Sequence, residues 1–380
     1  MNKKLIAMAV AAGLSAPLAA SAEPTVYGHL QVEVASIDDG GTKKANEDTG
    51  TPGSSYMGTD DNKRGRLGVK GSEDLGNGMS AIYNFEWQVE TTQGNPNDGS
   101  RVGMVGLKGG FGTVEAGALK QPYKYTGGVK YDPFVTTYME ARSRGGMSGK
   151  TTDRGHSTSG SFGHHGFFTD ALAYKNKFGP ISVWVATSFD EKGGAKGRDG
   201  DMNLSVKYDG GNFEAFYAMA VDDHTTGTTD LGLGAAGDND KYSGEYSASK
   251  FGGMFKMGSL KLKLQLETTE QKYNKTQTDG AGAFTATTGF YSKAWESDVM
   301  FIGAEFKMGK NVFVAQLGER ESSADTFKST TEYLAIGAIH KFSKKTRAFV
   351  GHSTTSDSNN TPGSKTVDGS VTSVGLRVDF

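Results

Sequence analysis

The stretch from Ser259 to Glu267 reads SLKLKLQLE, and a leucine occupies every second position. In an extended chain the leucines point to one side, whereas the lysines, the glutamine and the glutamate between them point to the other. A helix would scatter the same leucines around its whole circumference. The stretch therefore predicts a β-strand with one apolar face and one polar face. The leucines are Leu260, Leu262, Leu264 and Leu266.

The same alternation recurs along the chain in about sixteen segments, each about ten residues long. A tilted strand of that length crosses a bilayer. The expected strands begin near Thr25, Asn62, Gly78, Ser100, Phe111, Phe167, Gly179, Asp201, Asn212, Lys241, Ser259, Trp295, Asn311, Thr330, Lys344 and Ser370.

The connections between these segments alternate between short glycine-rich turns and long polar loops. EDLGNG at residues 73–78 and DGGN at residues 209–212 are examples of the turns. Barrels that span an outer membrane have short turns on one side and longer loops on the other, because their strands are antiparallel. The pattern predicts an all-β fold, an antiparallel transmembrane barrel over residues 23–380. The long loops are expected near residues 38–61, 91–99, 121–166, 190–200, 222–240, 272–294, 321–329 and 356–369.

The composition fits a barrel of this kind and excludes other classes of protein. Only 36% of the 380 residues are hydrophobic, as expected where one face of each strand meets lipid and the other meets water. The chain has no Cys, which excludes a disulfide framework and thiolate metal sites. Its 41 Lys and Arg against 43 Asp and Glu give no nucleic-acid-binding signature. We expect no metal and no cofactor.

Residues 1–22 are predicted to be a signal peptide. Lys3 and Lys4 precede an apolar stretch, and Ala20-Ser21-Ala22 forms a cleavage site of small residues. The apolar stretch is shorter than the ~20 residues that a membrane-spanning helix needs. At the other end, the terminal Phe380 follows an alternating strand and is similar to the signal that directs outer-membrane barrel assembly.

Two long blocks of sequence resemble the general trimeric porins of Gram-negative outer membranes. They are RLGVKGSEDLGNGMSAIYNFEW at residues 66–87 and SRVGMVGLKGGFGTVEAGALKQPY at residues 100–123. The opening TVYGHLQVEV and the closing SVGLRVDF add to the resemblance. It implies a homotrimer of sixteen-stranded, water-filled barrels in contact with outer-membrane lipid, including lipopolysaccharide. It also implies that the third long loop, residues 121–166, folds into the lumen and constricts the pore.

The resemblance further implies basic residues on the barrel wall that face acidic residues on this loop. By motif, Arg66 and Arg101 are the wall candidates, and Asp132 and Glu140 are the loop acids. Arg142 and Arg144 are additional loop candidates for the constriction. The loop is also rich in bases, with Lys124, Lys130, Arg142, Arg144, Lys150 and Arg154 against Asp132, Glu140 and Asp153. Where the family often has an arginine near the start of the sixth strand, this chain has Phe167.

These features predict passive diffusion of ions and small hydrophilic solutes, with a mild preference for anions. A substrate-specific channel is an alternative, and an outer-membrane hydrolase or an adhesin are weaker ones. A hydrolase needs a nucleophile beside a base, and the chain has no G-x-S-x-G motif. An adhesin predicts a plugged lumen, whereas a barrel of sixteen strands leaves an aqueous channel.

Overall fold

A computed structural model describes residues 23–38, 56–60, 64–148, 167–189, 202–228, 241–278, 284–285, 295–324 and 327–380. The expected signal peptide at residues 1–22 lies outside these residues and stays a prediction. No helix among the described residues is both long enough and apolar enough to cross a membrane.

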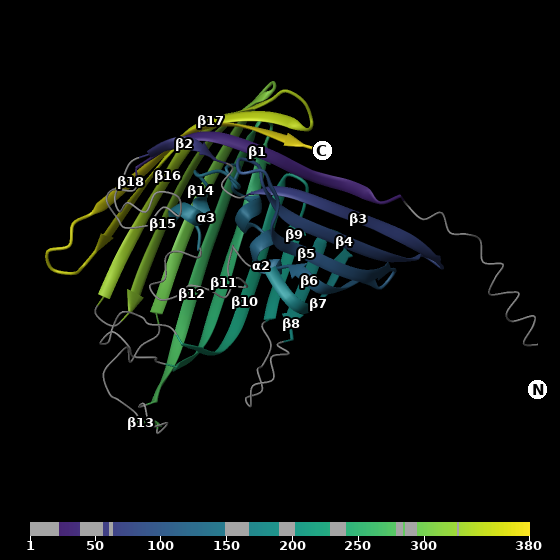
Figure 1. Cartoon of the computed structure of the whole chain (residues 1–380), viewed down its shortest axis with the longest axis horizontal. Coiled ribbons are helices and arrows are strands. Elements are labelled where there is room, and N and C mark those ends of the chain that lie inside the picture. Colours follow the sequence, from purple (N-terminus) through teal and green to yellow (C-terminus); the bar gives the residue numbers. More distant parts are fainter. Residues whose placement is uncertain are drawn as a thin grey trace, which may run out of the picture.

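Sixteen long antiparallel strands form one closed barrel, which confirms the predicted fold class (Figure 1). The barrel strands are β1 (Thr25–Asp38), β3 (Gly65–Gly76), β4 (Met79–Glu90), β5 (Asn95–Gly109), β6 (Gly112–Lys120), β7 (Phe167–Phe178), β8 (Ile181–Ser188), β9 (Met202–Asp209), β10 (Phe213–Thr228), β11 (Lys241–Met257), β12 (Leu260–Thr278), β14 (Trp295–Met308), β15 (Asn311–Ala324), β16 (Phe327–Lys341), β17 (Thr346–Asn359) and β18 (Val367–Asp379). Two short strands, β2 (Tyr56–Asp60) and β13 (Phe284–Thr285), lie within the long connections.

The barrel closes where β1 pairs with β18 on one side and with β3 on the other. The backbone of Gly28 joins that of the terminal Phe380 through two hydrogen bonds, of 3.0 and 3.3 Å. A Cβ atom on Gly28 would lie 2.1 Å from the carbonyl oxygen of Arg66 and 2.8 Å from the ring of Phe380. Only glycine therefore fits between the two neighbouring strands at this seam. The role of Phe380 in assembly stays a prediction.

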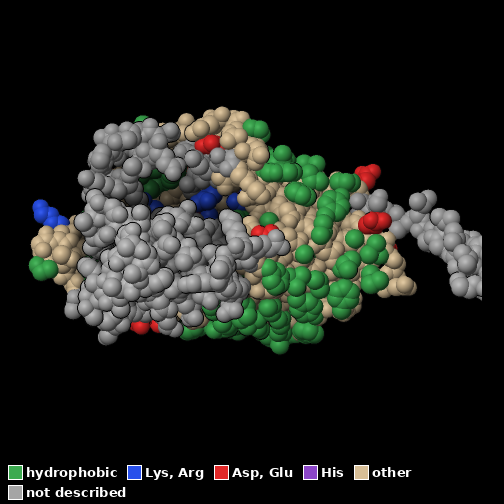
Figure 2. Space-filling model, turned by 60° about the horizontal axis from the view of Figure 1, so that its bottom comes forward, with side chains coloured by type: hydrophobic (Ala, Val, Ile, Leu, Met, Phe, Trp, Pro, Cys, Tyr) green, Lys and Arg blue, Asp and Glu red, His purple; other side chains and the backbone are tan. Residues whose placement is uncertain are grey.

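The burial pattern of the strands is the reverse of that in a water-soluble protein. On β12, Leu262 and Leu264 are 45% and 43% exposed, whereas Gln265 and Glu267 are 0% and 3% exposed. The apolar side chains therefore face outward and the polar ones face the lumen, as a barrel surrounded by lipid requires. Green hydrophobic side chains accordingly cover much of the outer surface in Figure 2.

The strand starts agree with the predicted ones within a few residues, but several strands run further into the predicted long loops. β10 reaches Thr228, β12 reaches Thr278, and β15 ends at Ala324, within the predicted loop at residues 321–329. β5 begins at Asn95 rather than near Ser100. The backbone ladder continues past the lipid because its hydrogen bonds need no apolar side chains. Strand ends predicted from the point where the alternation stops therefore made these strands too short.

The described part of the connection at residues 121–166 folds into the lumen. It contains α2 (Pro122–Tyr125), the 3-10 helix η1 (Gly128–Lys130) and α3 (Ala141–Arg144), so it is more ordered than a structureless loop. We call residues 121–148 the inner loop. Its hydrogen-bond partners lie on the inward faces of strands on opposite sides of the barrel, such as Gln31 on β1 and Gln265 on β12.

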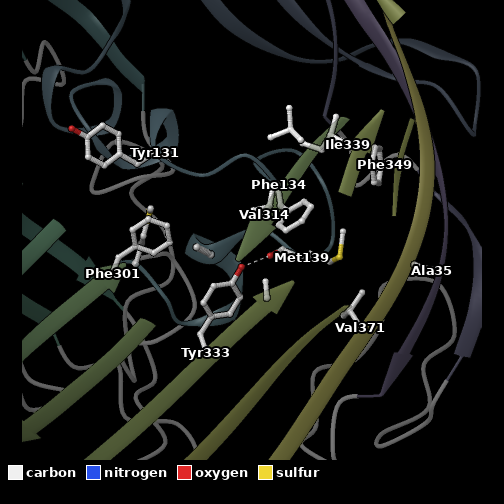
Figure 3. Packing of buried hydrophobic residues seen from close by; sticks show 14 of the residues in the cluster. Ala35, Tyr131, Phe134, Met139, Phe301, Val314, Tyr333, Ile339, Phe349 and Val371 are labelled. Atoms are coloured by element: carbon white, nitrogen blue, oxygen red, sulfur yellow. Dashed lines mark hydrogen bonds between the residues drawn. The ribbon is translucent and has the colours of Figure 1, made fainter. Parts of the chain in front are cut away.

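Apolar side chains fix the inner loop to one wall (Figure 3). Phe134 and Met139 are fully buried and belong to one cluster with inward-facing apolar residues of β15 to β18. Tyr333 of β16 also donates a hydrogen bond of 2.7 Å to the carbonyl oxygen of Met139. The main hydrophobic core is thus inside the barrel, between the loop and the wall. The wall residues in the cluster include Val312, Val314, Tyr333, Ala335, Ile339, Phe349 and Val371.

Candidate pore constriction

Arg66 lies on β3 with its side chain on the inward face. It pairs in register with His29 of β1, which is 4% exposed and also faces inward. The Nε atom of Arg66 is buried and has no hydrogen-bond partner among the described residues. The strand alternation therefore puts this guanidinium in the lumen, where the sequence predicted it.

Arg101 lies at an irregularity in the pairing of β4 and β5. Glu86 pairs with Val102 and Trp87 pairs with Ser100, so Arg101 is the extra residue of a β-bulge. A bulge re-aims a side chain relative to the regular strand. The Nε of Arg101 donates a hydrogen bond of 2.8 Å to Oε1 of Glu86, and Arg101 is 7% exposed.

Glu86 is the acid that contacts the basic residues of this wall, and sequence reasoning did not select it as a site residue. Its Oε2 accepts a hydrogen bond of 3.0 Å from the Tyr27 hydroxyl and lies 3.4 Å from the ammonium group of Lys120. Glu86 occupies the polar face of an alternating segment, so the alternation alone indicated that it faces the lumen. Glu86 offsets part of the positive charge of Arg101 and Lys120.

Phe167 is the first residue of β7, and two cations lie on its ring. The guanidinium carbon of Arg101 is 4.7 Å from the ring centroid, and Nζ of Lys124 is 4.1 Å from it. Cations interact favourably with aromatic faces at such distances. The aromatic ring therefore holds two positive charges near each other without contributing a charge of its own.

Glu140 of the inner loop is fully buried beside two arginines. Its carboxylate oxygens lie 2.9 Å from Nη2 of Arg64, which precedes β3, and 3.0 Å from Nη2 of Arg142 in α3. It also accepts a hydrogen bond of 3.1 Å from the backbone of Thr136. The structure thus brings Glu140 and Arg142 together next to the wall that carries Arg66.

Asp132 lies elsewhere and joins the inner loop to β15. Its Oδ1 accepts hydrogen bonds from Nε2 of Gln316 and from the backbone of Phe134, and its Oδ2 accepts one from the backbone of Ala141. Burial is the main cause that raises the pKa of Asp132 to about 6, although the hydrogen bonds oppose this effect. Its carboxylate is therefore engaged by the loop and β15 rather than by Arg66 or Arg101.

Lysines of the inner loop add positive charge to the same region. Burial, followed by the nearby Arg142 and Arg101, holds the pKa of Lys124 well below its usual range. Burial and the nearby Lys120 also lower the pKa of Lys130. A nearby positive charge disfavours the charged form of a lysine and lowers its pKa, so these two shifts indicate that positive charges are concentrated here. Blue Lys and Arg side chains are visible inside the hollow in Figure 2.

Arg144 points to a different part of the wall from Arg142. Its Nη2 donates a hydrogen bond of 3.3 Å to the hydroxyl of Thr355 on β17. Sequence reasoning did not select Arg64, Lys120 or Arg377 as site residues. Arg377 occupies the polar face of the closing strand, and its Nη1 donates a hydrogen bond of 3.3 Å to the hydroxyl of Thr136 in the inner loop.

A closed antiparallel barrel of sixteen strands, apolar outside and polar inside, with a loop folded into its lumen, defines a transmembrane barrel of the porin type. A sequence profile described as Gram-negative porin matches residues 7–360. The chain belongs to this family and is an outer-membrane protein.

Curated relatives share part of this sequence. The major outer membrane protein P.IB of Neisseria gonorrhoeae is 37% identical over 130 residues, which cover 33% of this chain and 34% of that protein. The protein of the same name from Neisseria meningitidis serogroup B is 37% identical over 132 residues, covering 34% and 37%. The chain thus spans about a third of the length of the curated relatives it matches.

Solved porin structures match nearly the whole chain. An anion-selective porin from Comamonas acidovorans superposes with a TM-score of 0.66 at 20% identity, covering 94% of this chain and 100% of that one. OmpT of Vibrio cholerae superposes with a TM-score of 0.66 at 12% identity, covering 94% and 97%. At such low identities these matches show the shared fold.

Proposed function

We propose that this protein forms a water-filled channel for the passive diffusion of ions and small hydrophilic solutes. The observation that carries the proposal is the line of charged side chains inside the barrel, where Arg66, Arg101 and Glu86 face the inner loop. Charged groups are costly in hydrocarbon but are stable beside water. Passive diffusion needs only a concentration gradient, so the proposal requires no catalytic residue.

The pore favours anions in this proposal. Arg64, Arg66, Arg101, Lys120 and Lys124 outnumber the acids Glu86 and Glu140 in the same region. The Nε atoms of Arg64 and Arg66 are buried and have no hydrogen-bond partner among the described residues, so the two guanidinium groups have unused hydrogen-bonding capacity. A ring of one charge sign selects ions of the opposite sign. The anion selectivity named for the Comamonas acidovorans porin supports the same direction.

The constriction in this proposal comprises Arg66 and Arg101 on the wall with Glu140 and Arg142 on the inner loop. Asp132 and Arg144 do not line the constriction in this proposal. They hold the inner loop to β15 and β17. We further propose a homotrimer in contact with outer-membrane lipid, including lipopolysaccharide. A solved structure of the Vibrio cholerae OmpT in a trimer form supports this assembly.

Reconstitution in a planar bilayer tests the channel and its selectivity. Current steps in groups of three support a trimer of open pores, and a reversal potential under a KCl gradient gives the ion preference. We expect a permeability ratio that favours chloride. A ratio that favours potassium would contradict the anion preference, and the absence of any conductance would contradict the channel.

An Arg66→Glu variant tests the position of the constriction. At ~10 Å in water, one charge changes the local ion energy by about 0.4 kcal/mol. Reversing the charge therefore shifts chloride and potassium by about 0.8 kcal/mol each in opposite directions, which changes the permeability ratio roughly 16-fold. Lys345→Glu, in the exposed turn between β16 and β17, is the matched control and leaves the ratio unchanged. An equal effect of the two variants would remove Arg66 from the constriction.

A further inference from the structure

A recess of about 450 Å³ lies on the short-turn side of the inner loop. Loop residues Tyr125 to Tyr131 form one side, and the inward faces of β8 to β12 and β14 form the other. The wall side chains come from strand ends next to the short turns, such as Trp184 near the start of β8 and Lys261 near the start of β12. The recess is therefore a side chamber of the lumen, and Lys130 on its loop side lies near enough to Arg66 and Glu86 of the constriction to interact with their charges.

Three wall lysines line the recess, and two carboxylates partly neutralise them. Lys207 lies 3.1 Å from Glu214 across the pairing of β9 and β10. Lys261 and Lys263 share Glu305 of β14, with the Lys261 ammonium group 3.6 Å away and Lys263 in direct contact. The wall alone thus has one more positive charge than negative charges.

Lys130 of the inner loop adds a fourth positive charge from the opposite side. Its side chain is exposed, and it forms no ion pair with an acid among the described residues. Its Nζ lies 5.6 Å from the ring centroid of Tyr125. The recess therefore has surplus positive charge, and the exposed ammonium group of Lys130 lies at its edge.

Aromatic side chains distinguish this recess from a simple basic patch. Tyr131 is oriented by a hydrogen bond of 3.0 Å from its hydroxyl to Glu214 and by edge-on contact with Phe216. Trp184 lies on the wall, and its buried indole N–H has no acceptor among the described residues. The recess thus offers rigid ring surfaces next to uncompensated ammonium groups.

We propose that this recess binds small organic anions that carry an aromatic ring, of which benzoate is the simplest. The carboxylate pairs with Lys130 and the wall lysines, and the ring packs against Tyr125 and Trp184. An inorganic anion or an aliphatic acid gains only the charge interaction, and a neutral aromatic solute gains only the packing. The inference rests on the proposed channel function, because it makes the recess a holding site along the diffusion path.

Calorimetric titration of the folded, detergent-solubilised protein tests the site without requiring conduction. Benzoate is compared with acetate, which has the same charge and no ring, and with benzamide, which has a similar ring and no charge. We expect saturable binding of benzoate at least tenfold tighter than that of either comparison compound. Equal binding of benzoate and acetate, or no binding of benzoate, would overturn the proposal.

Variants separate the two contributions to binding. Lys130→Gln is expected to weaken benzoate binding about tenfold, whereas Lys345→Gln in an exposed turn leaves it unchanged. Trp184→Phe is expected to retain binding and Trp184→Ala to lose most of it, each variant being checked for folding by its heat-modified mobility on gels. Unchanged binding in both Lys130→Gln and Trp184→Ala would place benzoate elsewhere.

Bilayer recording then connects the site to transport. At constant ionic strength, benzoate should interrupt the chloride current for brief periods, whereas acetate should not. Conductance that responds identically to both anions would contradict the holding site and leave the channel intact. Benzoate binding by a protein that never conducts would contradict the channel function and leave the binding site intact.

Discussion

Gln316 on β15 donates a hydrogen bond of 2.9 Å from Nε2 to Oδ1 of Asp132 in the inner loop. This bond joins two residues that are 184 positions apart in the sequence, and both are buried. Tyr333 extends the connection, because its hydroxyl, which lies 2.7 Å from the carbonyl oxygen of Met139, is also 3.0 Å from Oε1 of Gln316. The inner loop is therefore tied to β15 and β16 by polar contacts within an otherwise apolar cluster.

Asp132 should make the ion selectivity depend on pH. Because its pKa is raised to about 6, Asp132 is neutral at pH 5 and ionised at pH 7. The added negative charge should lower the chloride-to-potassium permeability ratio about fourfold between these values, because it disfavours chloride and favours potassium by about 0.4 kcal/mol each. Asp132→Asn should hold the ratio at its acid value throughout, as reversal potentials at pH 5 and pH 7 will show.

The raised pKa of Asp132 also determines how its contribution to the free energy of unfolding changes with pH. Its folded-state pKa lies above the ordinary value of 3.8, so the folded protein binds this proton more tightly. The resulting stabilisation is complete below about pH 3.8 and is lost as the pH rises through about 6. If the permeability ratio of Asp132→Asn changed between pH 5 and pH 7 as much as that of the wild type, the pH dependence would not come from Asp132.

Glu86→Gln should strengthen the preference for anions. The substitution removes the negative charge that Arg101 and Lys120 now share and retains an amide oxygen that accepts from Arg101. We expect the chloride-to-potassium ratio to rise about fourfold. Loss of a buried ionic partner costs about 3–5 kcal/mol, so the midpoint of unfolding should also fall. The control is Glu319→Gln on β15, outside the lumen, and an equal increase there would count against the prediction.

Gly318→Val should displace the inner loop from β15. A Cβ atom at Gly318 would lie 2.4 Å from Cα of Gly146, which no backbone contact tolerates. The loop can yield only away from this wall, towards the open part of the lumen. We expect lower single-channel conductance with more current noise, and a loss of about 1–3 kcal/mol from overpacking. In the control Gly110→Val, the added Cβ meets nothing within 4 Å, and conductance should not change.

Leu264→Arg should measure how deeply β12 lies in the lipid. Leu264 is the third of the four leucines on the outward face of β12, and its side chain is 43% exposed. An arginine at the bilayer midplane costs about 2–4 kcal/mol, but one near the interface costs only about 0–1. Leu75→Arg, next to the short turn after β3, is the comparison. Urea unfolding in lipid vesicles should separate the two variants, and equal losses would show that Leu264 is not in the apolar band.

The sequence was sufficient for the strands because their defining property is local. An extended chain places successive side chains on opposite faces, so the alternation of Leu262 and Leu264 with Lys263 and Gln265 indicates both the strand and its inward face. The same rule placed Arg66 in the lumen before any contact was known. It failed only where the ladder continues beyond the lipid, as at Thr228 and Thr278.

The contacts across the lumen could not be predicted from the sequence, because they join residues that no local rule relates. Bases and acids in the loop were visible in the sequence, but the separation of Asp132 from Glu140 was not. Asp132 contacts β15, whereas Glu140 contacts Arg64 before β3. Inward-facing apolar residues such as Phe349 were the one available signal, since a water-filled lumen gives no reason for them unless a loop covers them.

The sequence by itself thus determined the barrel class, the inward or outward direction of side chains in the regular strands and the excess of bases in the inner loop. These depend on strand geometry and on the contrast between lipid and water, which act residue by residue. Only the tertiary structure decided which charges meet, how Phe167 holds Arg101 and Lys124, and where the aromatic recess opens. Those contacts depend on closure of the ring and on the path of the loop across it, and both bring together side chains that are far apart in the sequence.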